Sequence, residues 1–272
     1  MNKILVTDLD NTLWPWLDWA VPALDAMVDY LAKQTHYSQE EIIAAIGVIA
    51  QQKGTVEYAG FVQDSRLFKG YDVHALARGA KQAFSRKRNA GLQLYEGVAE
   101  ILPCLVEMDI PLVALTDAPL AHATMRLRHF GLEEKFSLLI AVQDPEGTYL
   151  PEVEQKIIQG KYIPQIPFKR AIEPKPHTPL LQYLEAHFQR QINPTEVIIV
   201  GDNPVSDMGL AEKIGAQGLL AVYGRGEQHQ ELTERLCQYV AGRVAARNTA
   251  LNPDTNGSTP IQSFRDVLNY IA

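Results

Sequence analysis

Carboxylates follow two of the short apolar runs in this sequence. Asp8 and Asp10 come directly after the first run, and Asp202 and Asp207 follow a later run that ends at Gly201. Two carboxylates ~4 Å apart repel each other by about 4 kcal/mol at an effective dielectric constant near 20. If folding brings these four side chains together, they need positive charge beside them. Oxygen ligands of this kind suit a hard divalent cation such as Mg²⁺.

A threonine and a lysine could complete such a site. Thr116 ends another apolar run, and Lys175 stands between Pro174 and Pro176, which restrict the backbone around it. A cation, a lysine and a hydroxyl can share the oxygens of a phosphoryl group. Taken singly, each residue has an ordinary explanation, since an Asp after a strand often caps a helix and a Thr there often bonds its own turn. Their occurrence together, in this order, favours a functional site.

The apolar runs predict a parallel β-sheet, because they are short and continuously apolar, as strands buried on both faces are. They cover Lys3–Thr7, Pro111–Thr116, Leu138–Val142, Val197–Gly201 and Gly218–Val222. Segments with helical periodicity lie between them, at Val98–Met108, Pro119–Phe130, Pro179–Gln189 and Ser206–Ile214. This alternation predicts an α/β fold with a Rossmann-like parallel-sheet core. Loops converge at the carboxyl ends of such strands, where the candidate residues lie.

The segment from about Asp18 to Arg88 breaks this alternation. Its pattern is helical almost throughout, over Val21–Lys33, Ser38–Gln52, Val56–Leu67 and Val73–Lys87. Ser38 and Glu41 have the spacing of a capping box. A single crossover between parallel strands needs only one helix. The excess predicts a small all-helical domain at residues 15–93, with the core at 1–14 and 94–272.

Three later segments depart from the alternation of strands and helices. Asp144–Ile172 is rich in Pro and Gly and is interpreted as a loop-rich excursion that packs beside the open end of the main sheet. Gln228–Arg247 has the pattern of a surface helix. Asn252–Ser258 reads as an exposed connector.

Composition restricts the partners and the compartment. The 272 residues include 25 Lys plus Arg against 32 Asp plus Glu, for a net charge of −7. Nucleic-acid-binding domains are usually basic, so we expect no nucleic-acid partner. The cysteines, Cys104 and Cys237, have no metal-site spacing, which fits a reducing compartment. No apolar run reaches ~18 residues and no signal-cleavage pattern occurs, so we expect a cytoplasmic protein without a membrane span.

Together these residues resemble the motifs of the haloacid dehalogenase superfamily. Four motifs occur in the superfamily's order, which makes the resemblance specific, and they span Lys3–Val222. They are Asp8-Leu9-Asp10-Asn11-Thr12, Leu115-Thr116-Asp117, Lys175-Pro176 and Gly201-Asp202-Asn203-Pro204-Val205-Ser206-Asp207. Leu94–Val98 is similar to the segment that returns the chain from cap to core. The resemblance implies that the helical insert is the α-helical cap domain of this superfamily.

The resemblance also implies a phosphoric monoester hydrolase acting on a small phosphorylated metabolite. Asp8 would attack phosphorus and form an aspartyl-phosphate, which splits one difficult displacement into two. Asp10 would protonate the leaving oxygen and later help to activate water. Thr116 and Lys175 would hold the phosphoryl oxygens, and Lys175 would also steady Asp8.

The same resemblance implies a set of Mg²⁺ ligands. Asp8 would contribute its carboxylate and Asp10 its backbone carbonyl. Asp202 would be the further carboxylate ligand. Asp207 would be either a second ligand through water or a partner of Lys175.

Other functions stay open from the sequence. Dehalogenases of the superfamily lack an acid two positions after the nucleophile, so Asp10 favours phosphate esters over carbon–halogen bonds. A phosphomutase would use the same aspartyl-phosphate. A non-catalytic binding protein on this fold would be expected to have lost Asp8, Asp10 or Lys175, and all of them are present.

The substrate is not identified by the sequence. Its specificity would lie on the cap, and an Arg or Lys facing the site would favour an acidic leaving group, whereas Tyr and Gln would favour a sugar or polyol. The polar candidates are Glu57, Tyr58, Gln63, Arg66, Lys69 and Arg78. His122, His129 and His177 are expected to be surface or structural residues, since Asp10 fills the proton-transfer role.

Overall fold

Seven strands form the sheet that carries the candidate site, in the order β4-β3-β2-β1-β5-β6-β7, and every neighbouring pair is parallel. The computed structural model describes residues 3–146, 160–225, 227–240 and 257–271. The α/β fold predicted from the sequence is confirmed. The strands are β1 (Ile4–Thr7), β2 (Leu112–Pro119), β3 (Leu138–Val142), β4 (Phe168–Ala171), β5 (Val197–Gly201), β6 (Gln217–Ala221) and β7 (Thr259–Ile261).

Helices cover both faces of the sheet, as continuously apolar strands require. Alternate residues of β1 point to opposite faces: Leu5 joins the hydrophobic cluster that includes α5 and α6, whereas Ile4 and Val6 join the cluster that includes α8 and α9. The bounds of these helices are Val98–Glu107 for α5, Leu120–His129 for α6, Leu180–Phe188 for α8 and Asp207–Ile214 for α9. A short helix, α12 (Leu268–Ile271), ends the described chain.

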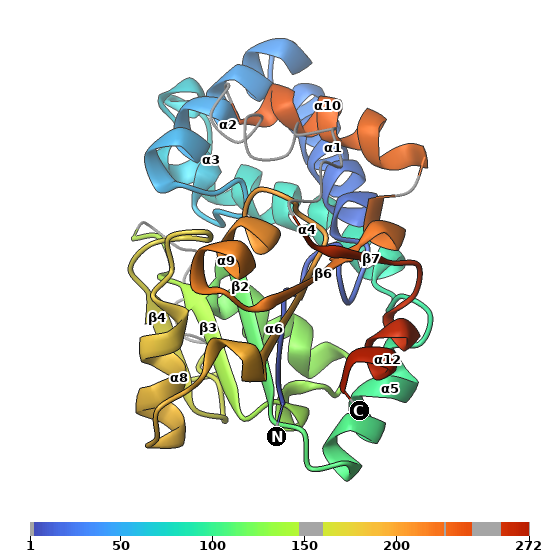
Figure 1. Cartoon of the computed structure of the whole chain (residues 1–272). Helices are drawn as coiled ribbons and strands as arrows, with labels where there is room; N and C mark the ends of the chain where they lie inside the picture. Colours follow the sequence, from blue (N-terminus) through green and yellow to red (C-terminus); the bar gives the residue numbers. More distant parts are fainter. Residues whose placement is uncertain (1–2, 147–159, 226, 241–256, 272) are drawn as a thin grey trace.

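The insertion between β1 and β2 is helical, as predicted, and has a hydrophobic cluster of its own. It contains α1 (Trp16–Gln34), α2 (Gln39–Lys53), α3 (Phe61–Asp64) and α4 (Val73–Gly91), drawn above the sheet in Figure 1. The capping box at Ser38 and Glu41 is present. The expectation of one helix over Val56–Leu67 is wrong, because the helix there, α3, covers only Phe61–Asp64. Extended Ser65 ends α3, and its hydroxyl caps a separate 3₁₀ turn, Arg66–Phe68.

The helix expected from Gln228 begins at Glu227 and forms α10 (Glu227–Tyr239), but it is not an isolated surface helix. It packs against α1 and α2, beside which Figure 1 shows it in orange. Leu236, Tyr239 and Val240 are buried in the hydrophobic cluster of the insertion. Residues 241–247 of the expected helix lie outside the described residues. In the sequence α10 lies between β6 and β7, yet it packs with the helical insertion.

The two other expected excursions both lead into strands. The last part of Asp144–Ile172 forms β4, which extends the sheet beside β3, so the expectation of a loop there is wrong. Residues 147–159 lie outside the described part. Gly257 and Ser258 lead into β7, and the remainder of that connector, 252–256, is also outside it. Among the described helices, none combines the length and the hydropathy that crossing a bilayer requires.

Candidate active site

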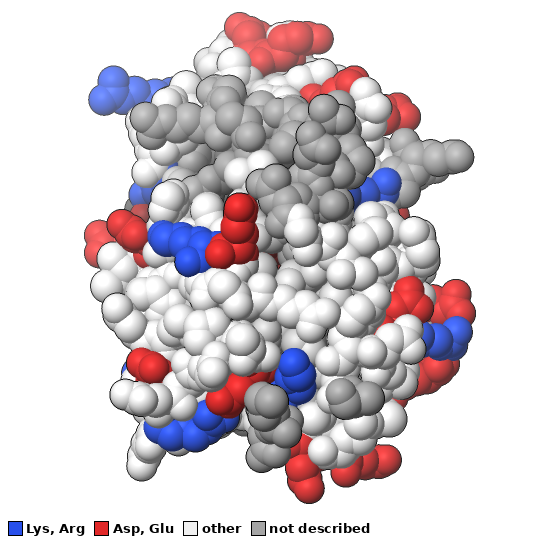
Figure 2. Space-filling view, in the orientation of Figure 1, with Lys and Arg blue, Asp and Glu red and all other residues white. Residues whose placement is uncertain are grey.

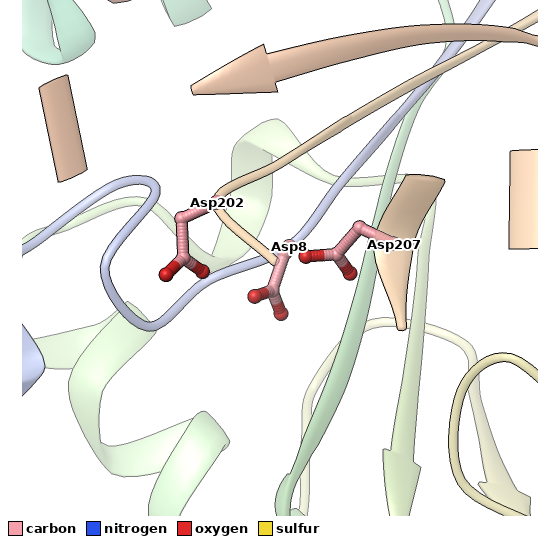
Figure 3. Close-up of side chains that lie close together, drawn as sticks. All are labelled: Asp8, Asp202 and Asp207. Carbon is pink, nitrogen blue, oxygen red and sulfur yellow. The ribbon is translucent and has the colours of Figure 1, made fainter. Parts of the chain in front are cut away.

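The candidate site lies where β1 and β5 end side by side. These strands are neighbours in the sheet, and the backbone amide of Asp8 donates to the carbonyl of Val200 at 2.8 Å. Asp8 therefore leaves β1 next to the loop that follows β5. Three carboxylate oxygens meet here, all within 4.8 Å of one another, and they come from Asp8, Asp202 and Asp207. Figure 3 shows the three side chains close together, with Asp8 between Asp202 and Asp207.

Lys175 lies inside this cluster. Its ammonium group is 2.8 Å from Asp8 Oδ1 and 2.6 Å from Asp207 Oδ1. The side chain is only 3% exposed, so both ion pairs are formed largely away from water. Its backbone amide donates to Asp117 Oδ1 at 3.0 Å, which anchors the loop to the end of β2.

Asp207 accepts hydrogen bonds on both of its oxygens. Oδ1 takes the Lys175 ammonium, and Oδ2 takes the backbone amide of Asn203 at 3.0 Å. The sequence left two roles open for Asp207, and its contacts are those of a partner of Lys175. Gly201 provides the room, because a Cβ at this position would lie 2.2 Å from Asp207 Oδ2.

The charges of the cluster are not balanced by Lys175 alone. Burial, with repulsion from Asp207, raises the pKa of Asp202 to about 8, and burial likewise raises the pKa of Asp8 well above its usual value. Although burial alone would lower the pKa of Lys175, Asp207 and Asp8 raise it well above its usual value. Carboxylates whose pKa values are raised this far bind protons where a divalent cation could bind instead. An all-oxygen donor set at this spacing fits Mg²⁺.

Thr116 lies near the carboxyl end of β2 and is 2% exposed. Its hydroxyl accepts the backbone amide of Ala118 at 3.1 Å, which is the local turn bond considered from the sequence. The hydroxyl proton remains available to a second partner, because that bond uses only an oxygen lone pair. The neighbouring carbonyl of Leu115 is 3.5 Å from the Lys175 ammonium, so this strand end borders the cluster.

The side chain of Asp10 points to a different partner. Both of its carboxylate oxygens accept Nη1 of Arg126, each at 2.9 Å, and Oδ1 also accepts the indole N–H of Trp14 at 2.5 Å. Arg126 lies on α6 and is 6% exposed. Its Nη2 donates to Glu57 of the helical insertion.

Sequence reasoning missed Arg126. A signal was present, because Ala123 and Leu127 mark the buried face of this helix and Arg126 lies three residues after Ala123, on the same side. A buried arginine requires carboxylate partners, which here come from two distant segments.

Among the polar candidates of the insertion, Glu57 contacts Arg126, the partner of Asp10. Tyr58 is buried, and its hydroxyl bonds to Asp64 at 2.5 Å. His122 Nδ1 lies 3.4 Å from Glu57 Oε1, and burial lowers the pKa of this histidine to about 4, so it is neutral near pH 7. That His122, His129 and His177 are surface or structural residues stays a prediction.

Comparison with known proteins supports the same assignment. A model of the haloacid dehalogenase-like hydrolase family matches residues 2–215. No curated protein matches the chain. Solved structures resemble it at low sequence identity. The 2-haloacid dehalogenase of Pseudomonas syringae pv. tomato DC3000 is 18% identical with a TM-score of 0.58, over 99% of this chain and 97% of that one.

Two further structures have the same fold. The HAD phosphatase of Thermococcus onnurineus is 15% identical with a TM-score of 0.56, over 99% of this chain and 98% of that one. The magnesium-bound structure of the HAD-hydrolase candidate YfnB from Bacillus subtilis is 16% identical with a TM-score of 0.52, over 99% and 98%. The family match and the aspartate cluster agree with the motifs read from the sequence. The chain belongs to the haloacid dehalogenase-like hydrolase family.

Proposed function

We propose that this hydrolase is a Mg²⁺-dependent phosphatase that cleaves a small phosphorylated metabolite through an aspartyl-phosphate on Asp8. The observation that carries the proposal is the convergence of Asp8, Asp202, Asp207 and Lys175 at the carboxyl ends of adjacent strands. A nucleophile between a lysine and a cation-binding carboxylate suits attack on an anionic phosphoryl group.

The chain's own residues divide the work. A carboxylate oxygen of Asp8 forms a bond to phosphorus while the bond from phosphorus to the ester oxygen breaks. A proton held by Asp10 goes to the leaving oxygen, so that the product departs as an alcohol. Lys175 orients Asp8 and shares the negative charge of the phosphoryl oxygens, with the hydroxyl of Thr116 as a further donor. In the second step Asp10 takes a proton from the water that attacks the aspartyl-phosphate.

The metal would be held by the carboxylates of Asp8 and Asp202 and by the backbone carbonyl of Asp10, with Asp207 serving mainly to hold Lys175. When bound, Mg²⁺ would neutralise charge on the phosphoryl oxygens and reduce repulsion between the acids. The raised pKa values of Asp8 and Asp202 support this placement, because these are the acids that Lys175 does not fully compensate.

Phosphate esters are favoured over carbon–halogen bonds because the chain has Asp10. When a carbon–halogen bond breaks, the halogen leaves as a halide ion, which needs no proton. An alkoxide leaving group does need one. The fold alone does not separate these reactions, since the 2-haloacid dehalogenase named above has the same architecture.

The test is phosphate release from a panel of ~100 phosphate esters, with and without Mg²⁺, by the wild-type protein and Asp8→Asn. We expect Asp8→Asn to lower kcat by at least ~1,000-fold, because removing a nucleophile eliminates the covalent route. Glu234→Gln, on the exposed side of α10, serves as a charge-matched control and should retain the wild-type rate. An Asp8→Asn protein as active as the wild type would overturn the proposal. Interconversion of hexose phosphates without phosphate release would instead indicate a phosphomutase.

A further inference from the structure

Beyond the aspartate cluster, one buried arginine joins the sheet to the helical insertion. Nη1 of Arg126 donates to both oxygens of Asp10 at 2.9 Å, and Nη2 donates to Glu57. Asp10 belongs to the loop after β1, whereas Glu57 belongs to the segment between α2 and α3. A single guanidinium group therefore connects the proposed acid of the reaction to the insertion.

Glu57 is held in a closely packed polar environment. Its side chain is 8% exposed, and Oε1 accepts the indole N–H of Trp16 at 3.2 Å in addition to the Arg126 bond. The guanidinium of Arg126 lies over the ring of Trp19, 5.0 Å from its centroid. Both tryptophans belong to α1, so the insertion contacts this arginine through two of its elements.

The same contacts set the orientation of Asp10. Pairing of both carboxylate oxygens with one guanidinium nitrogen fixes the carboxylate more tightly than a single contact would. The indole of Trp14, which is fully buried and stacks on Phe130 at 5.3 Å, holds Oδ1 from a second direction. Of these two donors, only Arg126 depends on the insertion for a partner of its own.

We propose that Arg126 is a positioning residue for Asp10 in phosphoryl transfer, and that Glu57 holds Arg126 in place when the insertion is docked on the sheet. This inference rests on the proposed function, in which Asp10 gives a proton to the leaving oxygen. Arg126 acts through Asp10 and transfers no proton to the substrate. Because Glu57 comes from the insertion, proton delivery depends on where the insertion lies.

The leaving group offers a readout that a purely structural role would not change. An alkyl phosphate releases a strongly basic oxygen and needs a proton, whereas 2,4-dinitrophenyl phosphate releases a weakly basic one and needs little help. A correctly placed general acid contributes about 100-fold to 10,000-fold. We expect Asp10→Asn to lose kcat/KM within that range on an alkyl phosphate that the wild type hydrolyses, and to lose much less on 2,4-dinitrophenyl phosphate. The ratio kcat/KM reports the first step alone, so the second role of Asp10, in hydrolysis of the aspartyl-phosphate, does not enter the comparison.

Arg126→Gln and Glu57→Gln should show the same leaving-group selectivity in kcat/KM. Arg126→Lys keeps the charge but loses the planar guanidinium, so it should recover part of the alkyl-phosphate rate. In the double variant with Asp10→Asn, Arg126→Gln should cost little more, because both changes remove the same contribution. Arg128→Gln is the matched control: it removes the neighbouring ion pair with Glu133 and should affect both substrates alike.

Equal losses on the two substrates, or full additivity with Asp10→Asn, would overturn the inference. Thermal unfolding of each variant establishes that it is folded. If Arg126→Gln does not fold, Glu57→Gln and Arg126→Lys still test the inference. Failure of the proposed function has a different signature, namely no phosphate release by the wild type or no effect of Asp8→Asn. Correct behaviour of Asp8→Asn with unselective Arg126 variants would remove only the inference.

Discussion

At the scale of single residues, Gly201 provides the space that the Asp207 carboxylate occupies. A Cβ there would approach Asp207 Oδ2 and Cγ to 2.2 Å, closer than non-bonded atoms allow. We expect Gly201→Ala to displace Asp207 and weaken its contact with Lys175. Loss of one preorganised charge contact of this kind lowers kcat by about 100-fold. The measurement is the initial rate of phosphate release at saturating substrate.

Gly209 is the matched control for this substitution. It lies in α9, the helix that follows β5 and the loop after Gly201. A Cβ there would lie 3.7 Å from Pro176 Cβ, an ordinary contact. Alanine is favoured over glycine inside a helix by up to about 1 kcal/mol, so Gly209→Ala should keep kcat and raise Tm slightly. Wild-type kcat in Gly201→Ala would mean that the Asp207 contact is dispensable.

The sequence suggested a cluster of four carboxylates, and the structure groups three of them, Asp8, Asp202 and Asp207. Their segments follow β1 and β5, which are neighbours in the sheet, so the carboxyl ends of these strands lie together. The partner of Asp10 could not be predicted in that way. Arg126 is 116 residues from Asp10 and 69 from Glu57, and their contact depends on how the insertion packs over α6.

At the scale of elements, the strands predicted from the sequence were those buried on both faces. β4 was missed because two of its four residues, Lys169 and Arg170, are exposed at the edge of the sheet. Charged edge strands lack the apolar run that marks a central strand. β7 was missed because it has three residues and includes Pro260. The residue boundaries proposed for the cap, 15 and 93, remain a prediction.

Besides its apolar packing, helix α10 bonds to the carboxylate of Asp25 on α1. Asp25 Oδ1 accepts Nε and Nη2 of Arg235 at 3.0 and 2.8 Å, and the hydroxyl of Tyr239 at 2.5 Å. Removing these bonds by Asp25→Ala should reduce the free energy of unfolding by about 1 kcal/mol, since the site is partly exposed and hydrogen bonds to charged groups contribute about that much there. Hydrogen exchange of the α10 amides should become faster than in the wild type.

Asp29→Ala on the same helix supplies the comparison for α10. Asp29 accepts an exposed hydrogen bond at 2.7 Å from Gln39, a residue of α2 and not of α10. Its removal should leave exchange in α10 unchanged. If Asp25→Ala also leaves that exchange unchanged, packing of Leu236 and Tyr239 alone is sufficient to hold the helix.

At the scale of the whole molecule, the chain joins the sheet to the helical insertion more often than a simple insertion requires. It enters the insertion at α1 and leaves it after α4, then returns through α10 and comes back to the sheet at β7. Tyr223 and Gly224, just before α10, contact the loop after β1: the Tyr223 hydroxyl donates to Thr12 O at 2.8 Å. On the face shown in Figure 2, acidic and basic side chains of described residues lie near one another. Docking of the insertion on the sheet involves specific contacts, such as those of the buried Arg126 with Asp10 and Glu57.

The unbalanced aspartate cluster should make the stability of the metal-free protein depend on pH. The pKa of Asp202 is about 8 in the folded protein, against about 3.9 in an unfolded chain. Between these values the folded state binds more protons, so the free energy of unfolding decreases as pH rises. The contribution is present in full below about pH 4 and is lost by pH 8. With EDTA present, we expect Tm to fall between pH 5 and pH 8.

Magnesium should reverse this dependence, because it binds the deprotonated carboxylates and stabilises the folded state by mass action. Addition of millimolar Mg²⁺ should therefore raise Tm more at pH 8 than at pH 5. Asp202→Asn removes one of the two acids whose pKa values are raised, so it should weaken the pH dependence with EDTA and reduce the effect of Mg²⁺. A Tm that is independent of pH with EDTA, together with no response to Mg²⁺ at pH 8, would contradict the placement of a cation between Asp8 and Asp202. The measurement needs no substrate, so it tests the metal site separately from the reaction.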